Sequence, residues 1–255
     1  MTPRTHEIQG GGGVRLHVRA FGPEAGRPIL FLHGWSQMHL CWTKQIESAL
    51  AEEFQLICPD LRGHGASERP VQPEAYGDGA LWAEDVAAIL GALELERPVV
   101  VAWSMAGWVL GDYLRIHGDA ALGGIVPVGA IYRGGALADA EIQARVKPDA
   151  SGAALLSADQ AKALTGTVNF VKACFAGPGG KRDMALMAAW TALCPVETRR
   201  ACIKRDVDFN AEYAAVTCPA LVIHGKADRV VPEATGAALA ACIPGAALER
   251  YGAGH

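Results

Sequence analysis

The residues that could do chemistry begin with a serine on a tight turn. Ser104 stands in the stretch Ala102-Trp-Ser-Met-Ala106, between an apolar run at 98–101 and a helical pattern that starts at Gly107. A serine at a strand-to-helix junction is lifted clear of the backbone, in a conformation that requires small flanking residues. The pattern therefore favours a nucleophilic serine, although alone it also occurs at ordinary buried turns.

A serine hydroxyl is a weak nucleophile at neutral pH and needs a histidine base, itself held by a carboxylate. Three histidines follow Ser104 in the chain. His117 ends the helical segment after the turn and should point away from the site, while His224 ends a buried strand and is expected to be structural. His255 follows a strand-like segment and the flexible Gly-Ala-Gly stretch 252–254. We therefore expect His255 to be the base.

Asp228 is the expected acid. It stands in the loop just after the apolar run 220–224, where the acid of such a triad belongs. The loop after the preceding run, 124–128, carries no carboxylate before Asp139. Asp228 could be an ordinary turn residue, but once Ser104 is accepted as the nucleophile the acid role is favoured.

Acyl transfer also needs N–H donors for the negative charge that develops on the carbonyl oxygen. We expect two main-chain N–H groups to supply them: that of Met105, next to the nucleophile, and that of Trp35, in the loop after the apolar run 28–32. The aromatic residues that indicate an apolar substrate pocket are Trp103, Phe170, Phe175 and Trp190.

Apolar runs that alternate with helical segments must position these residues. The segment 14–21 alternates like an edge strand, and 81–93 and 107–116 have helical periodicity. The short apolar runs are 28–32, 54–58, 99–102, 124–128 and 220–224. Nearly continuous apolar strands between helices are typical of a mostly parallel sheet with helices on both faces. The sequence thus predicts the α/β class.

A long helical segment separates the last two apolar runs. Residues 130–217 have helical composition and no clear strand. This is more than a plain crossover requires, and the segment leaves the carboxyl end of the sheet, where ligands bind in such folds. We predict a helical cap at 130–217 on a core made of 1–129 and 218–255. The alternative is a helical subdomain that only packs against the core.

Composition excludes several partners. The 255 residues are 51% hydrophobic and carry a net charge of −4, so neither nucleic acid nor an anionic membrane surface is expected to bind. The polar start at 1–13 and seven cysteines without a C-x-x-C pair indicate a reducing compartment, and we expect a cytoplasmic protein. The histidines are scattered along the sequence, so we predict no metal site. The oligomeric state stays open.

These motifs together resemble the α/β-hydrolase superfamily. The matching segments, in order along nearly the whole chain, are Leu32-His-Gly-Trp35, Pro59-Asp-Leu-Arg-Gly-His-Gly-Ala-Ser67, the serine turn, His224-Gly-x-x-Asp228-x-x-x-Pro232 and Gly252-x-Gly-His255. Within the superfamily the chain is similar to small capped carboxylesterases, to the cofactor-free haloperoxidase/perhydrolase group and to pimeloyl-carrier-protein methyl esterases. It departs from the usual pattern in having alanine on both sides of the serine turn.

The resemblance implies hydrolysis of a small-molecule carboxylic ester through an acyl-enzyme on Ser104, without cofactor or metal. Epoxide hydrolases and haloalkane dehalogenases of this fold have an aspartate at that position, so their reactions are not expected. Two alternatives stay open. The same triad could serve carbon–carbon bond hydrolysis, acyl transfer or perhydrolysis, or the chain could be a non-catalytic binding module on this fold.

The position of the base leads to one more expectation. Relatives continue past the base histidine with a loop and a closing helix, whereas this sequence ends at His255. Terminal residues are poorly held unless something ties them down. We therefore expect a truncated form of a longer protein, with a base that is not kept in its productive position.

Overall fold

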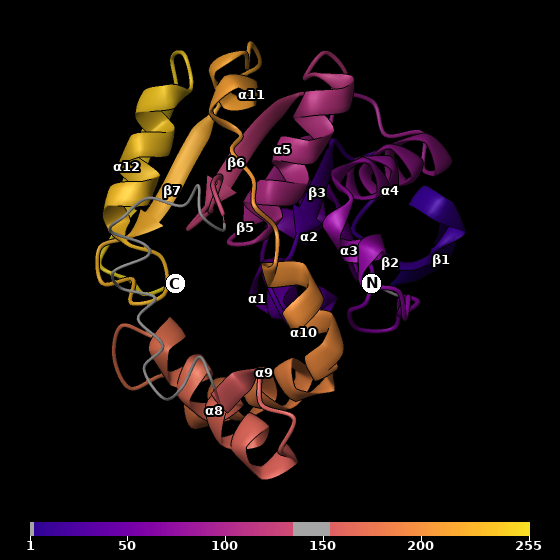
Figure 1. Ribbon diagram of the computed structural model, residues 1–255. Helices are drawn as coiled ribbons and strands as arrows, with labels where there is room; N and C mark the ends of the chain where they lie inside the picture. Colours follow the sequence, from indigo (N-terminus) through magenta and orange to yellow (C-terminus); the bar gives the residue numbers. More distant parts are fainter. Residues whose placement is uncertain (1–2, 135–153) are drawn as a thin grey trace.

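The computed structural model describes residues 3–134 and 154–255. Its centre is an eight-stranded sheet in the order β1-β2-β4-β3-β5-β6-β7-β8 (Figure 1). β2 is antiparallel to both of its neighbours, and every pair from β4–β3 to β7–β8 is parallel. The strands are β1 (Arg4–Gln9), β2 (Arg15–Phe21), β3 (Pro28–Leu32), β4 (Gln55–Pro59), β5 (Val99–Trp103), β6 (Gly124–Val128), β7 (Leu221–Gly225) and β8 (Ala247–Tyr251).

Helices connect the parallel strands, and the α/β class predicted from the sequence is confirmed. The 3-10 helices are η1 (Gly11–Gly13) and η2 (His39–Trp42). The α-helices are α1 (Thr43–Ile46), α2 (Leu50–Glu53), α3 (Glu74–Gly77), α4 (Gly79–Ala92), α5 (Ala106–His117), α8 (Gln160–Cys174), α9 (Lys181–Leu193), α10 (Val196–Ile203), α11 (Asn210–Ala214) and α12 (Glu233–Cys242). Within residues 3–134 and 154–255, no helix has the length and apolar character needed to cross a bilayer.

Alternate residues of the central strands enter two different cores. On β3, Leu30 and Leu32 belong to the larger core, which also takes side chains from α4, α5, α11 and α12. Phe31 belongs to the smaller core with Trp42 and Leu56. Because successive side chains of a strand point to opposite faces, this part of the sheet is covered on both sides. That is why its strands read as continuous apolar runs.

The antiparallel edge differs from the prediction. The segment expected to be an edge strand forms β2, which lies inside the sheet between β1 and β4. β1 is the edge strand, and of its residues only Ile8 is buried. A polar strand followed by a glycine run gives little periodic signal, so the sequence pattern does not reveal β1.

The expected cap region carries α8, α9, α10 and α11, while 135–153 lie outside the described residues. α8 packs against α9, and Figure 1 shows both beyond the carboxyl ends of the parallel strands. α10 contacts α3, whereas α11 contacts the core helices α5 and α12. The division of the chain at 130 and 217 stays a prediction.

Candidate active site

Ser104 lies on the turn between β5 and α5. Its φ of 56° is in the left-handed region, which costs a non-glycine residue about 1–3 kcal/mol. Hydrogen bonds hold it there: the Ser104 N–H donates to the Val128 carbonyl at 3.0 Å. The serine carbonyl accepts from the N–H groups of Gly107 and Ile131 at 2.9 and 3.1 Å. A Cβ on Gly107 would lie 2.4 Å from the Ile131 carbonyl oxygen, so this approach requires glycine.

A chain of three side chains joins the ends of β5, β7 and β8. Ser104 Oγ lies 2.8 Å from His255 Nε2, and His255 Nδ1 lies 2.8 Å from Asp228 Oδ2. The side chains of His255 and Asp228 are 2% and 0% exposed. With the proton on Nδ1, His255 donates to the carboxylate and accepts from the serine hydroxyl. In this arrangement the imidazole can take the serine proton.

The main chain holds His255 as well. Its N–H donates to the Cys174 carbonyl at the end of α8 at 2.8 Å, and the Ala227 N–H donates to the Ala253 carbonyl at 3.0 Å. Gly254 is so close to α8 that a Cβ there would lie 2.3 Å from the Cys174 oxygen. The poorly held base expected from its place in the sequence is therefore not observed, because the imidazole lies within hydrogen-bond reach of both partners.

Donors surround the Asp228 carboxylate on both sides. Oδ1 accepts from the N–H groups of Val230 and Val231, each at 2.8 Å. Oδ2 faces His255 at 2.8 Å and His224 at 3.4 Å. Burial would raise the pKa of Asp228, but the hydrogen bonds from the two histidines outweigh it and hold this pKa well below its usual range. Asp228 is therefore ionised throughout the neutral range.

His224, which the sequence suggests is structural, lies in contact with Asp228. Its Nε2 lies 3.4 Å from Asp228 Oδ2 and 3.0 Å from the Val231 carbonyl oxygen. The signal in the sequence is its position four residues before Asp228, across the turn that follows β7. Its place at the end of an apolar run hides that signal.

The loop after β3 passes beside the serine. A Cβ on Gly34 would lie 3.1 Å from Ser104 Cβ and 3.4 Å from the Trp103 ring. Trp35 follows this glycine, as Met105 follows the serine, and in the described part of the chain neither main-chain N–H has an acceptor. N–H groups without partners beside a nucleophile are what stabilisation of an oxyanion requires.

Two buried histidines fix this loop. His33 Nδ1–H donates to the Gly34 carbonyl at 2.8 Å, and His33 Nε2 accepts from the Leu61 N–H at 3.0 Å. The Ser36 N–H donates to His64 Nε2 at 3.2 Å. Because His33 Nε2 accepts a hydrogen bond, the ring is neutral, and burial lowers the pKa of His33 to about 3.

We expect the protein to lose stability between pH 6.5 and pH 4 because of His33. The pKa of this histidine is about 3 in the folded chain and about 6.5 in the unfolded chain. The unfolded state therefore binds more protons in this window, and the free energy of unfolding should fall by about 3 kcal/mol as the pH drops. Urea unfolding at several pH values measures the loss. His33→Asn should flatten the dependence, and an equally steep curve for the variant would refute the assignment.

Aromatic side chains from core and cap meet next to Ser104. The Trp103 ring lies 5.6 Å from that of His255, and the Phe170 ring lies 5.8 Å from that of Trp35. The small apolar cluster of Val171, Cys174 and Met187 is packed against all four expected pocket residues, Trp103, Phe170, Phe175 and Trp190. Two cavities, of about 260 Å³ between α5 and α11 and about 370 Å³ among α8, α9 and α10, are not lined by Ser104. The aromatic cluster is therefore the better candidate for the acyl site.

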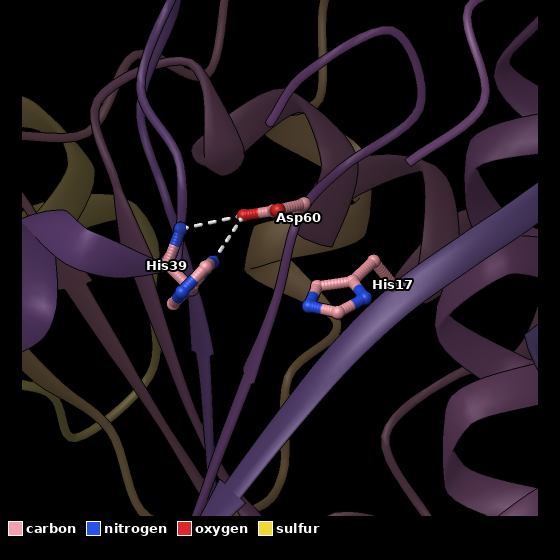
Figure 2. Close-up of side chains that lie close together, drawn as sticks. All are labelled: His17, His39 and Asp60. Carbon is pink, nitrogen blue, oxygen red and sulfur yellow. Dashed lines mark hydrogen bonds and ion pairs between the residues drawn. The ribbon is translucent and has the colours of Figure 1, made fainter. Parts of the chain in front are cut away.

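A separate cluster of His17, His39 and Asp60 lies where β2 meets the loops after β3 and β4 (Figure 2). These residues offer ligand atoms within 4.8 Å of one another. The histidines are scattered along the sequence, but the fold brings two of them together, which the sequence did not predict. The Asp60 oxygens already accept hydrogen bonds, however. Oδ1 accepts from the His39 N–H at 2.7 Å and the His39 ring at 2.9 Å, and Oδ2 accepts from the Ala66 N–H at 2.8 Å. The cluster holds the loops together, and we assign no metal to it.

The chain is similar to known proteins along nearly its whole length. Residues 29–255 match the model of the alpha/beta hydrolase family. The chain is 30% identical to non-heme chloroperoxidase CPO-A1 of Kitasatospora aureofaciens, over 95% of this chain and 89% of that protein. It is similar to esterase RhEst1 from Rhodococcus sp. ECU1013, with a TM-score of 0.90, 31% identity, and coverage of 98% of this chain and 91% of that one. A bromoperoxidase from Bacillus anthracis, at 24% identity, shares the fold with a TM-score of 0.81, over 100% of this chain and 93% of that one.

Proposed function

Because the chain belongs to the alpha/beta hydrolase family, we propose that it is a serine hydrolase that cleaves a carboxylic ester of a small, largely apolar substrate through an acyl-enzyme. The observation that carries the proposal is the hydrogen-bonded chain from Ser104 through His255 to Asp228. These are the groups that nucleophilic catalysis at an acyl carbon requires: a nucleophile, a base in contact with it, and a carboxylate that orients the base.

In the first half-reaction, Ser104 Oγ attacks the ester carbonyl carbon while His255 Nε2 takes the hydroxyl proton. The Oγ–C bond forms and the carbonyl π pair moves to the oxygen, which becomes an oxyanion. The N–H groups of Trp35 and Met105 stabilise this charge, and one such donor contributes about 2.7–4 kcal/mol. The tetrahedral intermediate then collapses: the bond to the alcohol oxygen breaks, and the His255 imidazolium returns the proton to the leaving alcohol.

In the second half-reaction, water attacks the acyl carbon and gives its proton to His255. Collapse of this intermediate breaks the bond to Ser104 Oγ, which regains the proton, and the carboxylic acid leaves. Asp228 stays ionised throughout, because hydrogen bonds from two histidines and two main-chain N–H groups favour its charged form. It keeps the His255 tautomer with the proton on Nδ1 and stabilises the imidazolium in both halves.

Hydrogen peroxide could replace water in the second half-reaction, and one observation favours this candidate. The relative that is 30% identical along nearly the whole chain is described as a non-heme chloroperoxidase. Attack of peroxide on the acyl-enzyme would release a peracid and regenerate Ser104, with no change in the nucleophile, base or acid. The same residues would therefore act in both reactions, which differ only in whether water or peroxide accepts the acyl group.

The kinetics of p-nitrophenyl esters test the proposal. With p-nitrophenyl acetate we expect a burst of one p-nitrophenolate per chain, followed by slower turnover, because the acyl-enzyme accumulates before water releases it. Esters of increasing chain length then measure the apolar acyl site. Addition of hydrogen peroxide should leave the burst unchanged and alter only the slow phase if peracid is formed. A chain that gives neither burst nor turnover would be a binding module, and the proposal would fail.

The proposal extends to the setting of the site. The described cysteines are all free thiols, which supports work in a reducing compartment such as the cytoplasm. Residues 130–217 are proposed as the cap over the substrate. Phe170 in α8, Phe175 directly after α8 and Trp190 in α9 all belong to the aromatic cluster beside the triad.

A further inference from the structure

His224 is buried at the end of β7, with 1% of its surface exposed. Its Nε2 lies 3.0 Å from the Val231 carbonyl oxygen and 3.4 Å from Asp228 Oδ2. Both neighbours are hydrogen-bond acceptors, so Nε2 carries the proton. One N–H group therefore faces both ends of the turn that carries the acid.

The contacts of this turn close into a ring. The Val231 N–H donates to Asp228 Oδ1 at 2.8 Å, and the Val231 carbonyl accepts from His224 at 3.0 Å. The same His224 nitrogen faces Asp228 Oδ2. One carboxylate oxygen is thus fixed by the backbone, and the other lies between the imidazoles of His224 and His255. Rotation of the carboxylate would weaken contacts on both sides.

Helix α12 packs against the opposite edge of the His224 imidazole, the edge that carries Nδ1. A Cβ on Gly236 would lie 2.3 Å from His224 Nδ1, so the helix can approach the ring only because glycine stands there. Nδ1 is buried and has no hydrogen-bond partner among the described residues. Among the described residues, the His224 ring therefore makes polar contacts only through Nε2, to the turn that carries Asp228.

Two carboxylates act on the charge of this ring, those of Asp228 and of Glu233 at the start of α12. They favour a protonated imidazole, and burial opposes it. In either charge state the Nε2–H beside Oδ2 stabilises the negative charge of Asp228. The same contact keeps Oδ2 directed at His255 Nδ1, which lies 2.8 Å away.

We propose that His224 is a positioning residue of the reaction, which fixes the turn carrying Asp228 and the direction in which Oδ2 meets the His255 imidazole. The inference rests on the proposed function, since it concerns the acid of the same triad. His224 touches neither the nucleophile nor the substrate site. It acts through Asp228, so its removal should change the reaction rate rather than substrate binding.

Three variants test the role. His224→Leu keeps the volume of the ring but loses the N–H, and we expect kcat to fall by about tenfold or more with little change in KM. His224→Gln places an amide N–H near the position of Nε2 and should recover most of the loss in kcat. His117→Leu, at the exposed end of α5, is the matched control and should behave as the wild type.

A measurement on the unaltered protein keeps the test decisive if a variant does not fold. Nitrogen-15 NMR of the histidine rings should show His224 protonated at Nε2 at neutral pH. A bare Nε2 would overturn the proposal, as would a folded His224→Leu variant with the wild-type kcat. The proposed function fails separately: only retention of more than a few per cent of activity by Ser104→Ala, or absence of both burst and turnover in the unaltered protein, speaks against it.

Discussion

Ser104→Ala is expected to lower kcat/KM for ester hydrolysis by at least about four orders of magnitude, because the nucleophile and its base act as a unit. The burst of p-nitrophenolate should disappear entirely, since no acyl-enzyme can form. The backbone at position 104 should not change, because alanine and serine meet the same steric constraint at a φ of 56°. Steady-state kinetics, burst amplitude and thermal unfolding of the variant measure all three expectations.

Ser48→Ala provides the matched control for this substitution. Ser48 is exposed, and its hydroxyl contacts only its own turn, donating to the Gln45 carbonyl at 2.8 Å and accepting from the Leu50 N–H at 3.3 Å. We expect this variant to keep wild-type activity. Retention of more than a few per cent of activity by Ser104→Ala, measured beside this control, would show that another residue is the nucleophile.

Asp228→Asn should lower kcat by about three to four orders of magnitude, because an amide in place of the carboxylate favours the wrong tautomer of His255. The fold should survive, since the Asn side-chain oxygen can still accept from the N–H groups of Val230 and Val231. Asp206→Asn, at an exposed position before α11, is the matched control and should be mild. Equal losses in the two variants would show that the acid has been assigned wrongly.

The same substitution should also lower stability, with a defined dependence on pH. Hydrogen bonds hold the folded pKa of Asp228 below its unfolded value of about 3.9. A depressed carboxyl pKa stabilises the fold at every pH above the unfolded value, and this contribution is lost as the pH falls through the folded value. Asp228→Asn should therefore be less stable than the wild type near neutral pH, and the gap should narrow below about pH 4. Denaturant unfolding of both proteins measures it.

Signals that are local in the chain predicted most of the fold and pointed to the three residues that the structure brings together. The serine turn could be located because the small residues Ala102 and Ala106 flank Ser104 between an apolar run and a helix. Asp228 and His255 follow segments that form neighbouring parallel strands, whose carboxyl ends meet at one edge of the sheet. Proximity of the three therefore follows from topology.

Features that depend on distant pairing were not predictable in this way. His17 and His39 come within 5.8 Å, measured between ring centres, only through the antiparallel pairing of β2 and the path of the loop after β3. The proposed role of His224 depends on a turn that folds back on itself, and the apolar run that ends at His224 hides the spacing between His224 and Asp228. β1 pairs through its backbone while most of its side chains face water, and a solvated strand has no hydrophobic pattern to detect.

The hydrogen bond from the His255 N–H to the Cys174 carbonyl limits how freely the proposed cap could be replaced by the cap of another protein. Helix α8 carries Phe170 of the proposed substrate site and, at its end, the Cys174 carbonyl that accepts from the proposed base. Arg229, next to the proposed acid, donates to the carbonyls of Lys172 and Phe175 at the same helix end. A chimera that joined this core to a foreign cap would keep Ser104, Asp228 and His255 yet lose these anchors. In the proposed function, substrate selectivity and catalysis therefore depend on the same end of α8. A transplanted cap would have to supply carbonyl groups that accept hydrogen bonds from His255 and Arg229.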